Sequence, residues 1–181
     1  MKNLSIVLIA GLLLCGCGKN ELSREDALAL IKKEKGYPRV FEYEIFYSDP
    51  YHATRLLEKG LEGKGLVTIK KTQKLKDIGS PLVHFTAKAE PYLINGTPEE
   101  WNADFAAGIQ RVKLADEDIG EITAIIADKS NNTATVEYTT VYKNITPFAV
   151  LLKRDLQKPQ QQVAYFALSD KGWVRQKRSK R

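Results

Sequence analysis

The chain is poor in the residues that mark several protein classes. Its 181 residues include only 2 cysteines, 12 glycines and 7 prolines. These counts exclude a disulfide-rich scaffold, a collagen and a low-complexity chain. The one long apolar run, residues 4–14, is too short to form a stable anchor across a bilayer. The remaining composition, with 43% hydrophobic and 28% charged residues, is that of an ordinary globular domain.

The beginning of the chain has the three-part plan of an export signal. Lys2 gives a positive start, residues 4–14 (LSIVLIAGLLL) are almost entirely apolar, and polar residues return after residue 16. Both cysteines of the chain lie where the apolar run ends, in residues 14–17 (Leu-Cys-Gly-Cys). This L-x-G-C motif resembles the lipobox of bacterial lipoproteins.

The resemblance implies a specific modification. In that family a peptidase cuts just before a cysteine whose thiol is joined to diacylglycerol, which places the cut between Gly16 and Cys17 and the lipid on Cys17. A small residue such as Gly16 admits the peptidase, and a thiolate is the nucleophile that accepts the lipid. Cys15 departs from the family pattern and is the alternative acceptor. We therefore expect residues 1–16 to be removed and residues 17–22 to form a short tether.

The resemblance also implies a location in the cell envelope. An aspartate after the lipidated cysteine is the family's usual inner-membrane retention signal, and this chain has Gly18 there. The expected site is the periplasmic side of the outer membrane, or the outer face of the cell membrane in a bacterium with one membrane. Five residues, 18–22, separate Cys17 from the first helix signal and extend at most about 17 Å. The expected partner is thus the membrane, reached through the lipid.

The excess of positive charge belongs to one end of the chain. Of 28 basic residues, Lys2 lies in the leader and five lie in the last seven positions, which leaves 22 against 22 acidic residues. A solvated terminus is the simpler interpretation of residues 175–181, and contact with anionic lipid or polymer is the functional one. The five basic residues are Arg175, Lys177, Arg178, Lys180 and Arg181.

The second half of the body, residues 96–174, predicts an α+β fold. A capping box at Thr97 begins a helix in which Trp101 and Phe105 form an apolar stripe expected in the core. Strands with a regular alternation follow, with hairpin turns at 130–132 and 170–172, and a short helix from Thr146 to about residue 155. The order implies a curved antiparallel sheet with a helix packed on its inner face. This pattern looks like the cystatin-like or nuclear-transport-factor-like cone.

The first half, residues 23–95, predicts a smaller α/β unit. Ser23 begins a helix to about residue 35, a strand covers residues 41–47, and Asp49-Pro50 begins another helix. The following strand, basic turn and strand resemble the strand–wing–strand of a winged-helix unit. A second interpretation of the same segment makes Ser80-Pro81 a helix start. Export removes the body from the chromosome, so no nucleic acid is expected as a partner, and a DNA-binding role is the remote alternative.

Motifs for chemistry are sparse. His52 and His84 are the only histidines, and the body has no cysteine to join them, so we expect no metal, no cofactor and no Cys/His nucleophile. The one acidic cluster lacks the spacing of a calcium loop, and we expect it in a solvated turn between two strands. The cluster comprises Asp116, Glu117, Asp118 and Glu121.

Two classes of function remain for such a body. The favoured one is a non-catalytic binding or accessory module that holds another envelope protein, a polymer or a small apolar ligand on the concave sheet. Aromatic residues expected near the mouth or core of the cone support it. The alternative is an envelope hydrolase with two Asp or Glu side chains facing one cleft. The aromatic residues are Tyr138, Tyr142, Tyr165 and Trp173.

Overall fold

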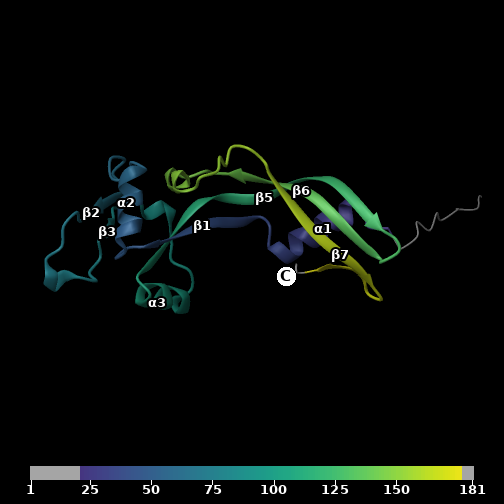
Figure 1. The fold of residues 1–181 in the computed structure, drawn as a ribbon, viewed down its shortest axis with the longest axis horizontal. Helices are drawn as coiled ribbons and strands as arrows, with labels where there is room; N and C mark the ends of the chain where they lie inside the picture. Colours follow the sequence, from purple (N-terminus) through teal and green to yellow (C-terminus); the bar gives the residue numbers. More distant parts are fainter. Residues whose placement is uncertain (1–20, 177–181) are drawn as a thin grey trace, which may run out of the picture.

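A computed structural model describes residues 21–176 and has the predicted α+β class. A long, strongly curled antiparallel sheet runs along the molecule, with a helix in its bend at one end and a small two-stranded sheet at the other (Figure 1). The expected curved sheet and the smaller unit preceding it are both confirmed. The sheet has the order β1 (Arg39–Phe46), β5 (Ile109–Asp128), β6 (Thr133–Lys143), β7 (Gln160–Ser169) and β8 (Gly172–Gln176), and β4 (Leu93–Ile94) pairs with β5.

The helix that packs on the curled sheet is α1 (Arg24–Lys35), not the helix that follows Thr97. Its ends are set by local chemistry. The Ser23 hydroxyl accepts the N–H of Asp26 at 3.0 Å, and Gly36 closes the helix at φ 67°, which favours glycine. Ile31 is fully buried between the helix and the sheet. The predicted helix at residues 23–35 is therefore confirmed, and it also supplies the inner face of the bend.

At the other end of the molecule, α2 (Pro50–Glu58) precedes a two-stranded sheet of β2 (Val67–Ile69) and β3 (Val83–Phe85). The two strands and the basic loop between them are confirmed for this segment, and the likeness to a winged-helix unit stays a prediction. The alternative helix start at Ser80-Pro81 is wrong, because the residues that follow pair in register with β2. The intervening residues 70–82 are named here the β2–β3 loop, and they contain the short 3-10 helix η1 (Leu75–Asp77).

Two hydrophobic clusters lie along the sheet, and each draws residues from both sides of residue 95. The first lies between α2, the two-stranded sheet and the first part of β5; the second lies between α1 and strands β5 to β7. Strand β5 contributes to both clusters. The boundary between the expected units 23–95 and 96–174 stays a prediction. The largest buried side chains of the first cluster include Phe148, Leu56 and Leu114, and those of the second include Phe166, Ile31 and Val136.

Strand β5 is continuous for 20 residues, which corrects the expected turn at the acidic cluster. Asp116, Glu117 and Asp118 pair in register with residues of β6, and Glu117 is only 4% exposed. The sequence pattern did not predict a strand here. The usual alternation of polar and apolar residues is interrupted by a buried carboxylate that has its own partners. The prediction of a solvated turn failed for that reason.

Bulges in β5 contribute to the curl of the sheet, and the first of those against β6 contains Gly120. The register of β5 against β6 shifts between Ile119 and Ile122, where β5 has one residue more than its partner strand. Such a bulge bends a strand and increases its twist. A Cβ atom at Gly120 would collide with the Thr139 hydroxyl, whose oxygen accepts the N–H of Glu121 at 3.1 Å. Glycine thus permits the close approach that lets β5 bend over α1.

Two further expectations about helices need correction. Helix α3 (Pro98–Ala106) has the predicted capping box, but none of its residues is buried, and Trp101 and Phe105 belong to neither cluster. The helix expected to run from Thr146 to about residue 155 is only a short 3-10 helix, η3 (Pro147–Leu151). It ends early because Leu152 already has an extended backbone, and its Phe148 and Leu151 are buried in the first cluster.

The burial pattern predicts a large difference between two aromatic truncations. Phe148→Ala should lower the free energy of unfolding by about 3–5 kcal/mol, because it opens a cavity in a close-packed cluster. Trp101→Ala should change it by less than about 0.5 kcal/mol, because the indole is exposed. Unfolding in guanidinium chloride, followed by circular dichroism, measures both. Equal losses for the two variants would show that α3 is part of the core.

Candidate functional site

A row of three polar side chains crosses the middle of the sheet. Arg39 on β1, Glu117 on β5 and Tyr142 on β6 lie directly opposite one another in register. One oxygen of the Glu117 carboxylate accepts from Nε of Arg39 at 2.7 Å and lies 2.7 Å from its Nη2, and the other accepts from the Tyr142 hydroxyl at 3.1 Å. We call these three residues the central row. It lies between the two hydrophobic clusters.

Aromatic side chains surround the central row. The Arg39 guanidinium lies 5.2 Å from the ring centre of Tyr37, and Arg154 lies 4.9 Å from that of Phe41 and 5.6 Å from that of Tyr142. Burial raises the pKa of Tyr142, and burial followed by the charge of Glu117 raises that of Tyr37. The Tyr142 phenol is protonated and donates its hydrogen bond to Glu117.

The charged groups of the central row are already paired with each other. Burial tends to lower the pKa of Arg39, but the hydrogen bond and the charge of Glu117 outweigh it, so the pKa lies above the ordinary arginine value. Glu117 is paired with a cation and has a donor on each oxygen. This arrangement stabilises three strands against one another. Glu117 is therefore not a free carboxylate facing a cleft, which is the arrangement that the hydrolase alternative would require.

The hollow of the molecule lies elsewhere, between α3 and the two-stranded sheet. It is a shallow depression of about 560 Å³ that is widely open to solvent. The Tyr47 hydroxyl donates to the backbone oxygen of Phe105 at 3.1 Å, which joins the end of β1 to α3 across the floor. His84 of β3 and Gln110 of β5 add polar groups to the lining. We call this space the α3 hollow.

Two exposed aromatic rings lie beside the α3 hollow, whose lining includes Phe105 but not Trp101. Trp101 and Phe105 stack with their ring centres 5.4 Å apart and their planes at 14°, while 47% of Trp101 and 63% of Phe105 remain exposed. A smaller recess of about 130 Å³ beside them is also lined by Asp104 and Gln110. Contiguous exposed apolar surface often marks a place where a protein binds something, whereas single exposed hydrophobic residues are ordinary. The α3 hollow is therefore the candidate binding site.

The carboxylates near the α3 hollow converge on an arginine. Nε of Arg111 donates to Asp104 at 2.6 Å, and its two Nη atoms lie 3.7 Å from Glu42 and 3.9 Å from Glu100. The hydrogen bond that Arg111 donates to Asp104, together with the acidic charges, raises the pKa of Arg111. The three acids thus surround one largely buried guanidinium, and the two on α3, Glu100 and Asp104, hold that helix against β5. They do not face one another across a cleft.

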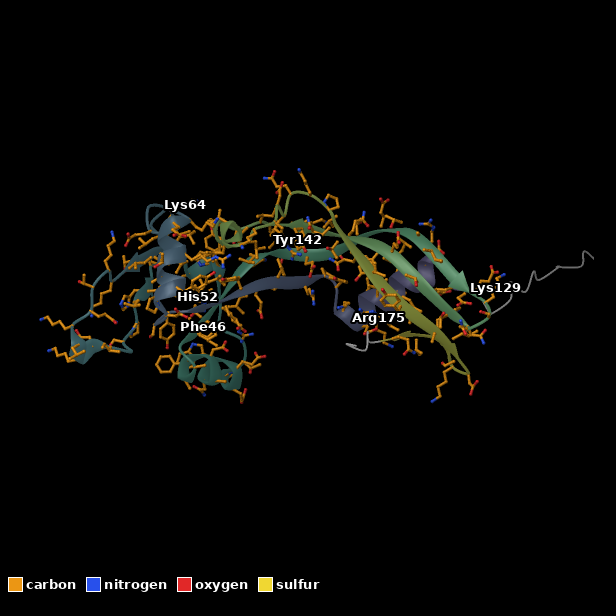
Figure 2. All side chains as sticks on the ribbon, viewed as in Figure 1. Phe46, His52, Lys64, Lys129, Tyr142 and Arg175 are labelled. Atoms are coloured by element: carbon orange, nitrogen blue, oxygen red, sulfur yellow. The ribbon has the colours of Figure 1, made fainter. Side chains whose placement is uncertain are left out.

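A second group of aromatic residues lies near α3, where β1 ends and α2 begins. The His52 ring lies 5.3 Å from that of Phe46, 5.7 Å from Tyr51 and 6.1 Å from Tyr43, centre to centre. Burial lowers the pKa of His52, which keeps the imidazole neutral at physiological pH. Figure 2 shows Phe46 and His52 together at this end of the molecule. His52 is thus part of an aromatic cluster on the surface.

The predicted lipidation and tail residues lie mostly outside the described part of the chain. Gly16 and Cys17 precede residue 21, and Lys177, Arg178, Lys180 and Arg181 follow residue 176. Arg175 is described and lies in β8, where its Nη1 donates to Glu34 of α1 at 2.8 Å with only 17% of the side chain exposed. This basic residue is thus engaged with α1.

The aromatic residues expected at a concave binding face have mixed positions. Tyr138 is 2% exposed in the second cluster, and Trp173 packs against that cluster. Tyr165 is 37% exposed, and Tyr142 belongs to the central row. Helix α1 fills the bend of the sheet. The α3 hollow lies at the opposite end of the molecule. We expected Trp101 and Phe105 in the core. Helix α3 has no second apolar position on each turn, and this absence was the sign that the helix is not buried.

No family model matches the chain, and comparisons with curated proteins and with solved structures found no match. Within residues 21–176, no cluster of three or more His, Cys, Asp or Glu side chains is arranged to hold a metal ion. None of the helices described is long and apolar enough to cross a membrane.

The central row predicts unequal costs for removing its two charges. Arg39→Ala leaves the buried Glu117 carboxylate without a cation and should lower the free energy of unfolding by about 2–3 kcal/mol. This value is below the usual range for a broken buried pair because Arg39 is 43% exposed. Glu117→Gln keeps the shape and should cost less, since Arg39 can turn to water. Denaturant unfolding measures both variants.

The double variant Arg39→Ala/Glu117→Gln is the control. It should be more stable than Arg39→Ala alone, because no charge is then left buried without a partner. If Arg39→Ala is no less stable than Glu117→Gln, the central row does not hold the strands together as described.

Proposed function

We propose that the protein is a lipid-anchored bacterial envelope protein that binds a partner molecule through the α3 hollow and acts as an accessory module rather than as an enzyme. The lipobox-like motif ending at Cys17 supports the anchor. The exposed, stacked pair of Trp101 and Phe105 beside the α3 hollow supports the binding role. That pair is the observation on which the binding role rests.

The two ends of the molecule are consistent with an anchor at one end and a binding surface at the other. Glu21 is the first described residue, and its carboxylate lies 3.0 Å from Nζ of Lys129 in the β5–β6 hairpin. Cys17 is four residues earlier, so at most about 14 Å of extended backbone join its Cα atom to that of Glu21. Lys129 marks one end of the molecule in Figure 2, and the α3 hollow lies toward the other end. The anchor and the binding surface therefore do not obstruct each other.

The chemistry of the α3 hollow indicates what kind of partner it accepts. Its walls combine aromatic rings with uncharged polar groups, and Asp104 and Arg111 are already paired beside it. Such a lining provides broad contact area from the rings and orientation from a few hydrogen bonds. A peptide segment of another envelope protein, a polymer chain or a small, mainly apolar ligand would satisfy it.

The anchor is tested by substituting each cysteine separately. Cys17→Ser should move nearly all of the protein from the membrane fraction to the soluble fraction after a high-salt wash, because a hydroxyl cannot accept the lipid. Cys15→Ser is the matched control and should stay in the membrane fraction. Mass spectrometry of the native chain should show a mature end at Cys17 with an added lipid. A Cys17→Ser protein that remains with washed membranes would exclude the anchor.

The binding role is tested by photo-crosslinking in cells. A photoreactive amino acid at position 101 should give a discrete adduct, and Phe105→Ala in the same chain should reduce its yield about ten-fold, since it removes half of the stacked pair. The control position is 126, where Ile126 is also exposed but lies on β5 far from the α3 hollow. Equal adducts from both positions would show that the hollow has no binding preference.

A further inference from the structure

The β2–β3 loop exposes two large aliphatic side chains at its tip. Leu75 is 86% exposed and Ile78 is 70% exposed, the two highest values among the exposed large hydrophobic residues of the described chain. Neither residue belongs to either hydrophobic cluster. Figure 1 places this loop at the extreme end of the molecule, beyond β2 and β3. Two large apolar side chains are therefore exposed at the tip of the loop and contribute nothing to the hydrophobic core.

The tip has a defined conformation. The side-chain amide of Gln73 donates to the backbone oxygen of Ser80 at 2.9 Å and joins the two arms of the loop. Within it, the N–H of Asp77 donates to the Lys74 oxygen at 2.9 Å and the N–H of Ser80 donates to that of Asp77 at 3.0 Å. These bonds form the turn around η1 and keep Leu75 and Ile78 on the outside. The apolar tip is thus a built feature of the loop.

The tip is also basic. Residues 70–79 (KKTQKLKDIG) contain four lysines and one aspartate. Lys70 pairs with Asp77 at 3.7 Å and Lys71 with Glu62 at 3.6 Å. The ion pairs of the described chain include neither Lys74 nor Lys76, and these two lysines flank Leu75 on both sides. Two uncompensated positive charges therefore surround the exposed apolar side chains.

From this arrangement we infer that the β2–β3 loop inserts its tip into the interface of an anionic phospholipid bilayer, with Leu75 and Ile78 at the acyl boundary and Lys74 and Lys76 on lipid phosphates. The inference goes beyond the proposed function and does not depend on a lipid at Cys17. Apolar side chains that enter the acyl boundary beside lysines that remain at the headgroups are the usual composition of an interfacial membrane contact.

A protein partner fits this tip less well. A stable protein interface buries about 800 Å² on each side and is centred on aromatic and arginine side chains, with lysine depleted. The narrow loop presents two aliphatic residues and several lysines instead. A bilayer requires no shape complementarity, and its phosphates supply the negative charge that Lys74 and Lys76 lack in the fold. The chemistry of the tip therefore favours a lipid surface.

The position of the tip determines how the molecule would lie on a bilayer. The loop and the β5–β6 hairpin lie at opposite ends of the long axis (Figure 1). A chain attached near Glu21 by its tether and at Leu75 by its tip would lie along one bilayer. The α3 hollow, lined in part by Gly79 and Pro81 of the same loop, would then open close to the membrane surface. Partners that are themselves in the membrane would have access to it.

The experiment uses the absence of cysteine from residues 18–181. Both hydrophobic clusters are formed by residues 22–173, so an unlipidated chain of residues 18–181 contains the whole described fold. Ile78→Cys in this chain carries an environment-sensitive fluorophore, and Ile126→Cys is the matched control at an exposed isoleucine near the opposite end. Both are mixed with vesicles of equal parts phosphatidylglycerol and phosphatidylcholine, and with vesicles of phosphatidylcholine alone.

We expect the emission of the label at position 78 to shift to the blue on the anionic vesicles and the label at position 126 to stay unchanged. In the label-free chain, Leu75→Ser should weaken partition into these vesicles about ten-fold, through lost apolar burial. Lys74→Gln with Lys76→Gln should weaken it by about ten-fold or more, and added salt should have the same effect. All of these residues are exposed in the fold, so the variants should keep the circular dichroism spectrum of the parent.

Three outcomes would overturn the inference. The first is an unchanged label at position 78 in the presence of anionic vesicles. The second is partition that is unaffected by Leu75→Ser and disappears when the chain ends at Gln176, which would assign vesicle binding to the basic tail. The third is a label at position 78 that responds only to a protein partner in a membrane extract, which would make the tip a protein contact.

Discussion

The pairing of the buried Glu117 carboxylate is the interaction on which the arrangement of the sheet depends. A charge at this depth is stable only beside a cation and a hydrogen-bond donor, and strands β1 and β6 supply one each in Arg39 and Tyr142. Because the partners lie opposite in register, a slip of one residue would turn each of them to the other face. The central row thus fixes β1 and β6 on β5 where one hydrophobic cluster ends and the other begins.

Local signals predicted the elements whose causes are local. The cap at Ser23 and the glycine at position 36 set α1, and the hairpin turn at 130–132 and the alternation of β6 set the second half of the sheet. Two errors had a common, non-local origin. The continuity of β5 depends on Arg39, 78 residues away in sequence from Glu117, and the exposure of Trp101 depends on which elements cover α3. A spacing of four residues describes a helix face but not its surroundings.

Only part of the candidate site could be predicted from the sequence. The motif that ends at Cys17 is contiguous, so its residues can be recognised without a fold. The α3 hollow combines Tyr47, His84 and Phe105, which come from three elements far apart in the chain, and no spacing relates them. The tip of the β2–β3 loop lies between these cases: its lysines were evident, but the exposure of Leu75 follows from the strand pairing that makes the loop protrude.

The order of strands leaves the curled sheet with two open edges, β1 and β8. An open edge can recruit a strand from a neighbouring chain, which is how sheets polymerise. Outward charges interrupt both edges here: Glu42 and Glu44 are exposed along β1, and β8 is a short strand of five residues. Glu42, which also pairs with Arg111, and Glu44 therefore discourage fibril growth at high local concentration, a condition that confinement to a two-dimensional surface would impose.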